Sequence, residues 1–131
     1  MNAFLYLDLT NSKQLQSYHK TDVQLVKAHF LDVAILDIDA ASDELLVHYV
    51  KRIIQEASKT VICIKTDETA TFKILVGLLE DLSAAKGQQL ILLRGENQRL
   101  QRILEARPQL NFKHIRTETD LLAELELFYT F

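Results

Sequence analysis

Five short apolar runs alternate with longer segments of helical periodicity along this chain of 131 residues. Each run is nearly continuous in its apolar character and gives way to a polar break, which is typical of strands buried on both faces of a parallel sheet. Such strands need a layer of helices on each side, so the pattern predicts an α/β three-layer sandwich around a five-stranded, mostly parallel sheet. The runs are FLYLDL (4–9), VAILDI (33–38), TVICI (60–64), QLILL (89–93) and FKHI (112–115).

The order of the strands is restricted by the right-handed crossovers that join consecutive parallel strands. We expect the flavodoxin-like order 2-1-3-4-5, because it keeps the connections short and places helices on both faces of the sheet. Other orders, and an antiparallel last strand, stay open at this point. The chain length fits a single α/β domain over residues 1–131, and three glycines and one proline leave little material for long loops.

Capping residues mark several expected helix ends. Asn97 can cap the helix that follows the fourth strand, and Thr117 and Asp120 have the spacing of a capping box. Gly87 is expected to end the third helix in a left-handed conformation. The segment 12–30 between the first two strands could hold one bent helix or two.

Charge and composition limit the classes of partner. A net charge of −3 gives no electrostatic reason to expect nucleic acid or an anionic membrane surface. No window approaches the roughly 20 apolar residues of a spanning helix, and the N-terminus has no signal-peptide pattern. Cys63 is the single cysteine, so no internal disulfide can form, and we expect it buried in the third strand. We therefore expect a cytoplasmic protein without a nucleic-acid or membrane partner.

Acidic residues follow the first three expected strands. The carboxyl ends of parallel strands meet at one edge of the sheet, where ligands bind in this class of fold. Carboxylates that converge there could hold a hard cation, so Mg²⁺ is the one cofactor left open, and no other is expected. The alternative is that each acid only satisfies free backbone amides where a strand turns into a helix. The candidate residues are Asp8, Asp37, Asp39 and Asp67.

Two of these acids lie in stretches that resemble known phosphoryl-transfer motifs. Residues 32–40, DVAILDIDA, resemble the phosphoacceptor strand of response-regulator receiver domains, which implies phosphorylation of Asp37. A receiver has two βα units before that strand and an acidic pair on its first strand, whereas this chain has room for one unit and has Asp8 alone. The pair Asp37 and Asp39 also resembles the DxD motif of haloacid-dehalogenase-like phosphatases, although that motif belongs on the first strand.

A longer resemblance covers the second half of the chain. From residue 60 to 127 the order of strands and helices, including KGQQLILL, NQRLQRILE and TETDLLAELE, resembles the C-terminal portion of STAS domains, the fold of anti-sigma-factor antagonists. The resemblance implies a STAS-like regulatory domain that phosphorylation of a serine or threonine releases from a protein partner. Where that family has a sequence such as DSSG, this chain has TDETAT (66–71), so Thr69 and Thr71 are the phosphorylation candidates. Thr71 could equally cap the third helix.

Glycine spacing argues against the usual nucleotide-binding turns, because the chain has neither GxGxxG nor GxxxxGK. Arg94 and Gly95 lie between the fourth strand and its helix, where helix amides could meet an anion, or where a plain tight turn is needed. The four histidines lack the spacing of metal ligands, and His114 is expected to have a structural role within the last strand.

The third expected helix, which starts near Thr71, has an apolar surface wider than one stripe. It either packs centrally or makes a subunit contact, which gives Phe72, Leu75 and Leu79 as interface candidates. Since no convincing catalytic set is found, we expect a non-enzymatic regulatory or protein-interaction domain, with a protein partner or self-association. The alternative is a small Mg²⁺-dependent phosphoryl-binding or phosphoryl-transfer protein that uses the strand-end acids.

Overall fold

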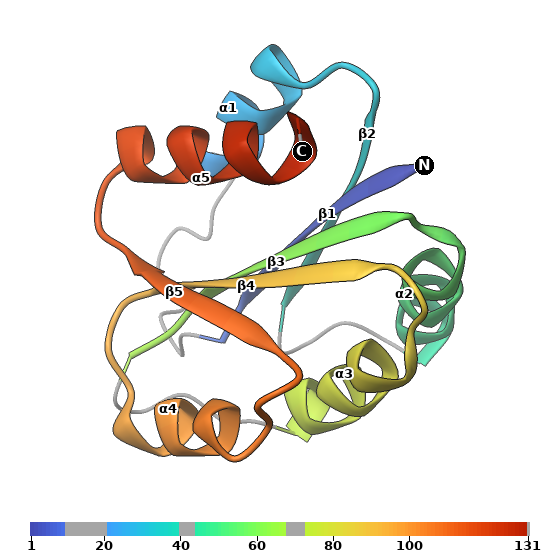
Figure 1. Ribbon diagram of the computed structural model, residues 1–131, viewed down its shortest axis with the longest axis vertical. Helices are drawn as coiled ribbons and strands as arrows, with labels where there is room; N and C mark the ends of the chain where they lie inside the picture. Colours follow the sequence, from blue (N-terminus) through green and yellow to red (C-terminus); the bar gives the residue numbers. More distant parts are fainter. Residues whose placement is uncertain (10–20, 40–43, 68–72, 131) are drawn as a thin grey trace.

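The computed structural model describes residues 1–9, 21–39, 44–67 and 73–130. These residues form strands and helices that alternate along the chain, as the apolar runs predict (Figure 1). The strands are β1 (Asn2–Asp8), β2 (Val33–Asp39), β3 (Lys59–Lys65), β4 (Gln88–Arg94) and β5 (Asn111–Ile115). The helices are α1 (Thr21–His29), α2 (Glu44–Glu56), α3 (Lys73–Ala84), α4 (Gln98–Glu105) and α5 (Glu118–Thr130).

The five strands form one parallel sheet in the order β2-β1-β3-β4-β5. The flavodoxin-like order is therefore confirmed, together with the α/β fold. The alternative of an antiparallel last strand is wrong, because β5 pairs with β4 in parallel. Strands β2 and β5 lie at the two edges of the sheet.

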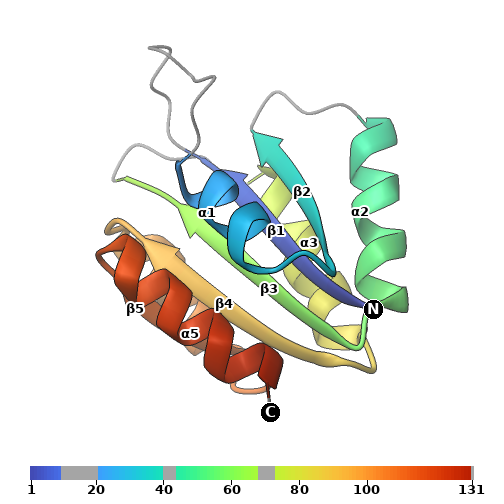
Figure 2. The same cartoon turned by 90° about the horizontal axis from the view of Figure 1, so that it is seen from above.

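Helices cover both faces of the sheet, which makes three layers. Helices α1 and α5 lie side by side on one face, and α2, α3 and α4 cover the other (Figures 1 and 2). Alternate side chains of a strand enter opposite faces. In β1, Leu5 and Leu7 join the core beneath α2 to α4, while Phe4 and Tyr6 join the core beneath α1 and α5.

The inner strands explain why the apolar runs are continuous. Five consecutive side chains are buried in β1 and again in β3, because both faces of each strand are covered. At the edge, residues 33–36 of β2 are only half-buried and Asp37 is exposed. Within the described part of the chain, no helix has the length and apolar character needed to cross a bilayer.

The predicted caps at the starts of α4 and α5 are confirmed. The Asn97 side chain accepts a hydrogen bond from the Leu100 amide at 3.0 Å and so caps α4. At α5, the Asp120 amide donates to Thr117 Oγ1 at 3.1 Å, and the Thr117 amide donates to Asp120 Oδ2 at 3.2 Å. The backbone amides of Arg116 and Thr117 hold the pKa of Asp120 below its ordinary value. Helix α1 begins at Thr21, and residues 10–20 lie outside the described chain, so the count of helices in 12–30 is untested.

The prediction that Gly87 has a left-handed conformation is wrong. The left-handed glycine is Gly95, with φ of 108°, and Gly87 does not have a positive φ. Gly87 is instead confined by space, because a Cβ there would lie 2.5 Å from the carbonyl oxygen of Ala57 and 2.6 Å from that of Ser58. The next amide, of Gln88, donates to the Ser58 carbonyl at 2.9 Å, so the two backbones approach closely at the start of β3 and β4.

Candidate functional site

The carboxyl ends of the strands carry opposite charges on the two halves of the sheet. At one register position, Asp39 of β2 pairs with Asp8 of β1, and Asp8 pairs with Lys65 of β3. Lys65 in turn pairs with Arg94 of β4. This edge of the sheet is therefore acidic on β2 and β1 and basic on β3 and β4.

Of the four acids that the sequence suggested as a cation site, Asp8 and Asp39 are neighbours in register, and the other two lie away from that position. Asp37 lies two positions earlier on the edge strand, in register with Tyr6, and Asp67 follows the end of β3. In the described residues, no three His, Cys, Asp or Glu side chains gather closely enough to hold a metal ion. The side chain of Asp39 lies outside the described part, so the Mg²⁺ hypothesis keeps Asp39 as an untested member.

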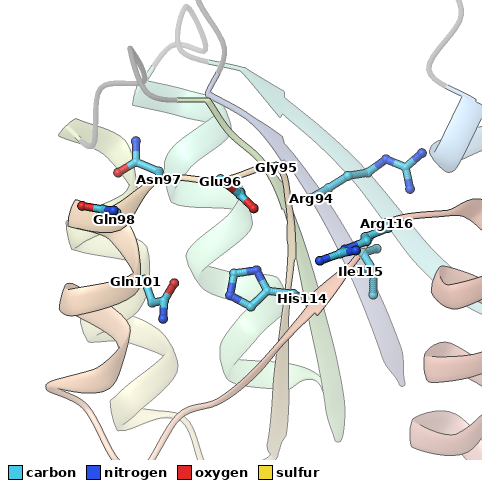
Figure 3. A pocket seen from close by; sticks show the side chains of 9 residues that line it. All are labelled: Arg94, Gly95, Glu96, Asn97, Gln98, Gln101, His114, Ile115 and Arg116. Carbon is cyan, nitrogen blue, oxygen red and sulfur yellow. The ribbon is translucent and has the colours of Figure 1, made fainter.

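A buried ion pair connects α1 with the end of β4. Arg94 Nε lies 3.2 Å from Asp22 Oδ2, and the two side chains are 26% and 4% exposed. In Figure 3, Arg94 extends toward α1 and away from His114. Burial raises the pKa of Asp22, the charge of Arg94 partly opposes that shift, and Glu118 adds to it. Asp22 Oδ1 and Arg94 Nη1 are buried without a hydrogen-bond partner in the described residues, so the pair is not bidentate.

Two weakly acidic side chains lie beneath this pair. Tyr6 and Cys63 are neighbours in register on β1 and β3, and both are buried. Burial is the largest cause that raises the pKa of each, and the negative charge of Asp22 raises both further. Cys63 is therefore a neutral thiol in the core, as the sequence predicts.

The loop after β4 is tied to the loop after β3. The Thr66 amide donates to the Arg94 carbonyl at 2.9 Å, and Asn97 Nδ2 donates to the Asp67 carbonyl at 2.7 Å. Gly95 lies between these two bonds, and a Cβ on it would lie 2.0 Å from the Thr66 carbonyl oxygen. Both its positive φ and this contact require glycine, so Gly95 serves a tight turn, one of the two roles the sequence left open.

A cavity of about 610 Å³ opens beside this turn, on the α4 side of the sheet. In Figure 3, the side chains of Glu96, Gln101 and Arg116 are directed toward the space around His114. The His114 ring packs edge-to-face on Phe112, with ring centroids 6.2 Å apart. The lining consists of Arg94, Gly95, Glu96, Asn97, Gln98, Gln101, His114, Ile115 and Arg116.

The sequence pointed to Arg94 and Gly95 at this cavity but missed the rest of it. His114 and Arg116 come from the end of β5, and Gln98 and Gln101 come from α4. Side chains alternate between the two faces of a sheet along each strand, and this alternation could have indicated the position of His114. His114 lies two residues after Phe112, so both side chains are on the face that α4 covers. Nothing in the local sequence around Asp22 indicates that it pairs with Arg94.

The remaining candidates are the residues suggested for an interface or for phosphorylation. Leu79 is fully buried in the core beneath α2 to α4, where it is not accessible to a partner. Thr69, Thr71 and Phe72 lie outside the described residues, as does the side chain of Leu75.

Comparisons with known proteins find no relative of this chain. No family model, no curated protein and no solved structure matches the chain. The resemblances to STAS and receiver domains therefore stay expectations, and a function has to be argued from the surface and the cavity themselves.

Proposed function

We propose that this protein is a non-enzymatic regulatory domain that binds a protein partner along the outer edge of β2. The observation that carries the proposal is the apolar character of this edge. Strand β2 is seven residues long, and in the described residues only β1 pairs with it. Residues 33–36 are partly exposed, and Leu31, two positions before the strand, is 86% exposed. A long apolar edge with free backbone groups is a template for another strand.

The opposite edge of the same sheet lacks these properties. Strand β5 has five residues, and its exposed positions include Lys113 and His114. Lys113 Nζ also lies 3.0 Å from Glu124 of α5, which places a charged pair beside this edge. Short length and charged side chains are the features that protect natural edge strands from pairing. Strand β2 has neither feature over residues 33–36, which favours it as the binding edge.

Strand addition explains how such an edge can recognise a partner. Main-chain hydrogen bonds supply affinity, and the side chains on alternate faces supply specificity. Here Val33 and Ile35 belong to the core beneath α1 and α5, and Leu36 packs on the core beneath α2 to α4. A bound strand would cover part of the exposed surface of these three side chains, so binding and burial act together.

Photo-crosslinking from the edge tests this function. With p-benzoylphenylalanine in place of Leu31 in the full chain, expressed in its native host, we expect a covalent adduct of discrete mass. The matched control replaces Leu127 of α5, which is also an exposed apolar residue at 55%. Adducts that form equally from both positions, or from neither, contradict the proposal.

A second candidate function is the binding of a small phosphorylated ligand in the cavity beside α4. It is favoured by the convergence of His114, Arg116 and Gln101 on one space. The N-terminus of α4 at the same cavity adds partial positive charge, while Glu96 opposes an anion there. A Mg²⁺-dependent form of this candidate would also need the acids Asp8, Asp37, Asp39 and Asp67 of the neighbouring strands.

Phosphate titration followed by NMR tests the second candidate. We expect inorganic phosphate to shift the His114 ring resonances saturably, and Arg116→Ala to weaken binding about tenfold because one charged hydrogen bond is lost. Arg102→Ala is the control, since Arg102 is an exposed arginine of α4 that does not line the cavity. Equal effects of the two variants, or no saturable shift with or without Mg²⁺, exclude this function.

A further inference from the structure

We infer that the partner of the β2 edge is a second copy of this chain, joined through antiparallel β2 strands about a two-fold axis. This inference rests on the proposed function and names its partner. The two sheets would then continue into each other across the interface. A two-fold axis brings the same edge of each copy together, so no second recognition surface is required.

The apolar residues of β2 favour a partner with its own helix layers over an isolated peptide. Val33 and Ile35 lie on one face of the sheet and Leu36 on the other, and all three are only partly buried. An isolated strand would form hydrogen bonds with the β2 backbone but leave the outer surface of these three side chains in water. A second α/β edge brings a helix to each face, so it removes apolar surface from water on both sides.

Exposed side chains beside the edge point to the same partner. On α2, Val50 is buried toward the sheet, and Lys51 reaches Asp81 of α3, with Nζ and Oδ2 3.9 Å apart. At about 100° per residue, Tyr49 lies about 160° around the helix from Lys51. It therefore faces away from α3, and it is 53% exposed. Ile53, one helical turn further on the same side of α2, belongs to a small core cluster against which Leu36 of β2 packs, so this flank of α2 is the one nearest β2.

Leu31 completes this flank at the start of the strand. It is 86% exposed, and it lies within the turn in which the Val33 amide donates to the Phe30 carbonyl at 3.4 Å. Leu31 and Tyr49 are two of the four large hydrophobic side chains found exposed in the described residues. Both lie beside the β2 edge, where a second copy would cover them.

Charge favours the antiparallel orientation. Asp37 is exposed toward the carboxyl end of β2, while Lys27 and His29 are exposed in the last turn of α1, near the amino end of β2. Antiparallel pairing brings the carboxyl end of each strand to the amino end of the other, where Asp32 is the one exposed acid of that turn. Antiparallel pairing also brings Asp37 to the end of the partner strand where Lys27 lies, whereas parallel pairing would set Asp37 against its own copy with Lys27 at the far end of the strand.

Sedimentation of the full chain over a range of concentrations tests the inference. We expect a monomer–dimer equilibrium, and Leu31→Lys and Tyr49→Lys should each raise the dimer Kd at least about tenfold. Both residues are exposed, so the variants should keep the folded circular-dichroism spectrum of the parent. Leu127→Lys is the control, because Leu127 is an exposed apolar residue of α5 away from the β2 edge. Its Kd should equal that of the parent.

Hydrogen exchange gives a second readout, specific to strand pairing. Amides of β2 should exchange more slowly as the protein concentration rises, while amides of β5 should not change. A parent protein that stays monomeric at millimolar concentration overturns the inference, and so does a dimer that only Leu127→Lys dissociates. If the crosslink from position 31 reaches a different protein while the chain stays monomeric, self-association is wrong and the interaction function stands. If position 31 gives no adduct, the proposed function itself fails.

Discussion

Replacing Gly95 by alanine is expected to lower the free energy of unfolding by about 4 kcal/mol. The backbone at Gly95 has φ of 108°, a conformation that costs a residue with a side chain about 1–3 kcal/mol. The new Cβ would also lie 2.0 Å from the Thr66 carbonyl oxygen, and overpacking adds a cost of about 1–3 kcal/mol. Thr66 cannot move away freely, because its amide is bonded to the Arg94 carbonyl at 2.9 Å. Urea denaturation followed by circular dichroism measures the change.

Gly77→Ala is the matched control for this experiment. Gly77 is an exposed residue within α3, and a Cβ there would meet nothing within 4 Å. Alanine in a helix interior is more stable than glycine by about 0.5–1 kcal/mol, so this variant should be slightly stabilised. If both variants change stability in the same direction, the tight turn at Gly95 is not the constraint that its geometry indicates.

Replacing Arg94 by alanine is expected to cost about 3 kcal/mol, because it leaves the Asp22 carboxylate buried without its counter-ion. Asp22 is 4% exposed, and uptake of a proton by its carboxyl group keeps the cost at the lower end of the range for broken buried pairs. Replacing both residues by leucine should recover most of this loss, since apolar residues can substitute for a buried ion pair. The exposed pair of Arg52 and Glu56 is the control, and Arg52→Ala should cost less than about 1 kcal/mol.

The pH dependence of stability gives an independent check on Asp22. Its pKa is raised above the ordinary value of 3.8 in the folded protein, so protonation of Asp22 favours folding. The stability from this proton is fully present below pH 3.8 and is lost as the pH rises through the folded pKa. Relative to Asp22→Asn, which cannot titrate, the parent protein should therefore gain stability as the pH falls toward 4. A difference between the two that does not vary with pH would show that Asp22 is not desolvated.

Sequence patterns predict the fold well here because the strongest pattern reports burial on both faces of a strand. The runs of β1, β3 and β4 are apolar throughout because helices cover both faces of these strands. The need for helices on both faces also restricts the possible orders of the strands. Short polar residues at helix starts were equally informative. Asn97 and Thr117 act through bonds within three residues, so the local sequence contains the whole interaction.

The same patterns do not distinguish an edge strand from an inner one. VAILDI has the composition of a buried strand, yet residues 33–36 are partly exposed because β2 has one neighbour instead of two in the described residues. The site residues were missed for a related reason. Asp22 meets Arg94, and His114 meets the cavity of α4, only through the order of the strands, which no single segment encodes.

The position of the single thiol gives every variant of this protein a built-in kinetic reporter. Cys63 lies in the middle strand of the sheet, fully buried, with a pKa raised by burial. A thiol reagent can reach it only after α1 or α5 has moved off this face of the sheet or the sheet itself has opened, because Cys63 lies in the core beneath these two helices. The rate of labelling in native buffer thus tracks the free energy of opening of this core, without denaturant or an added chromophore.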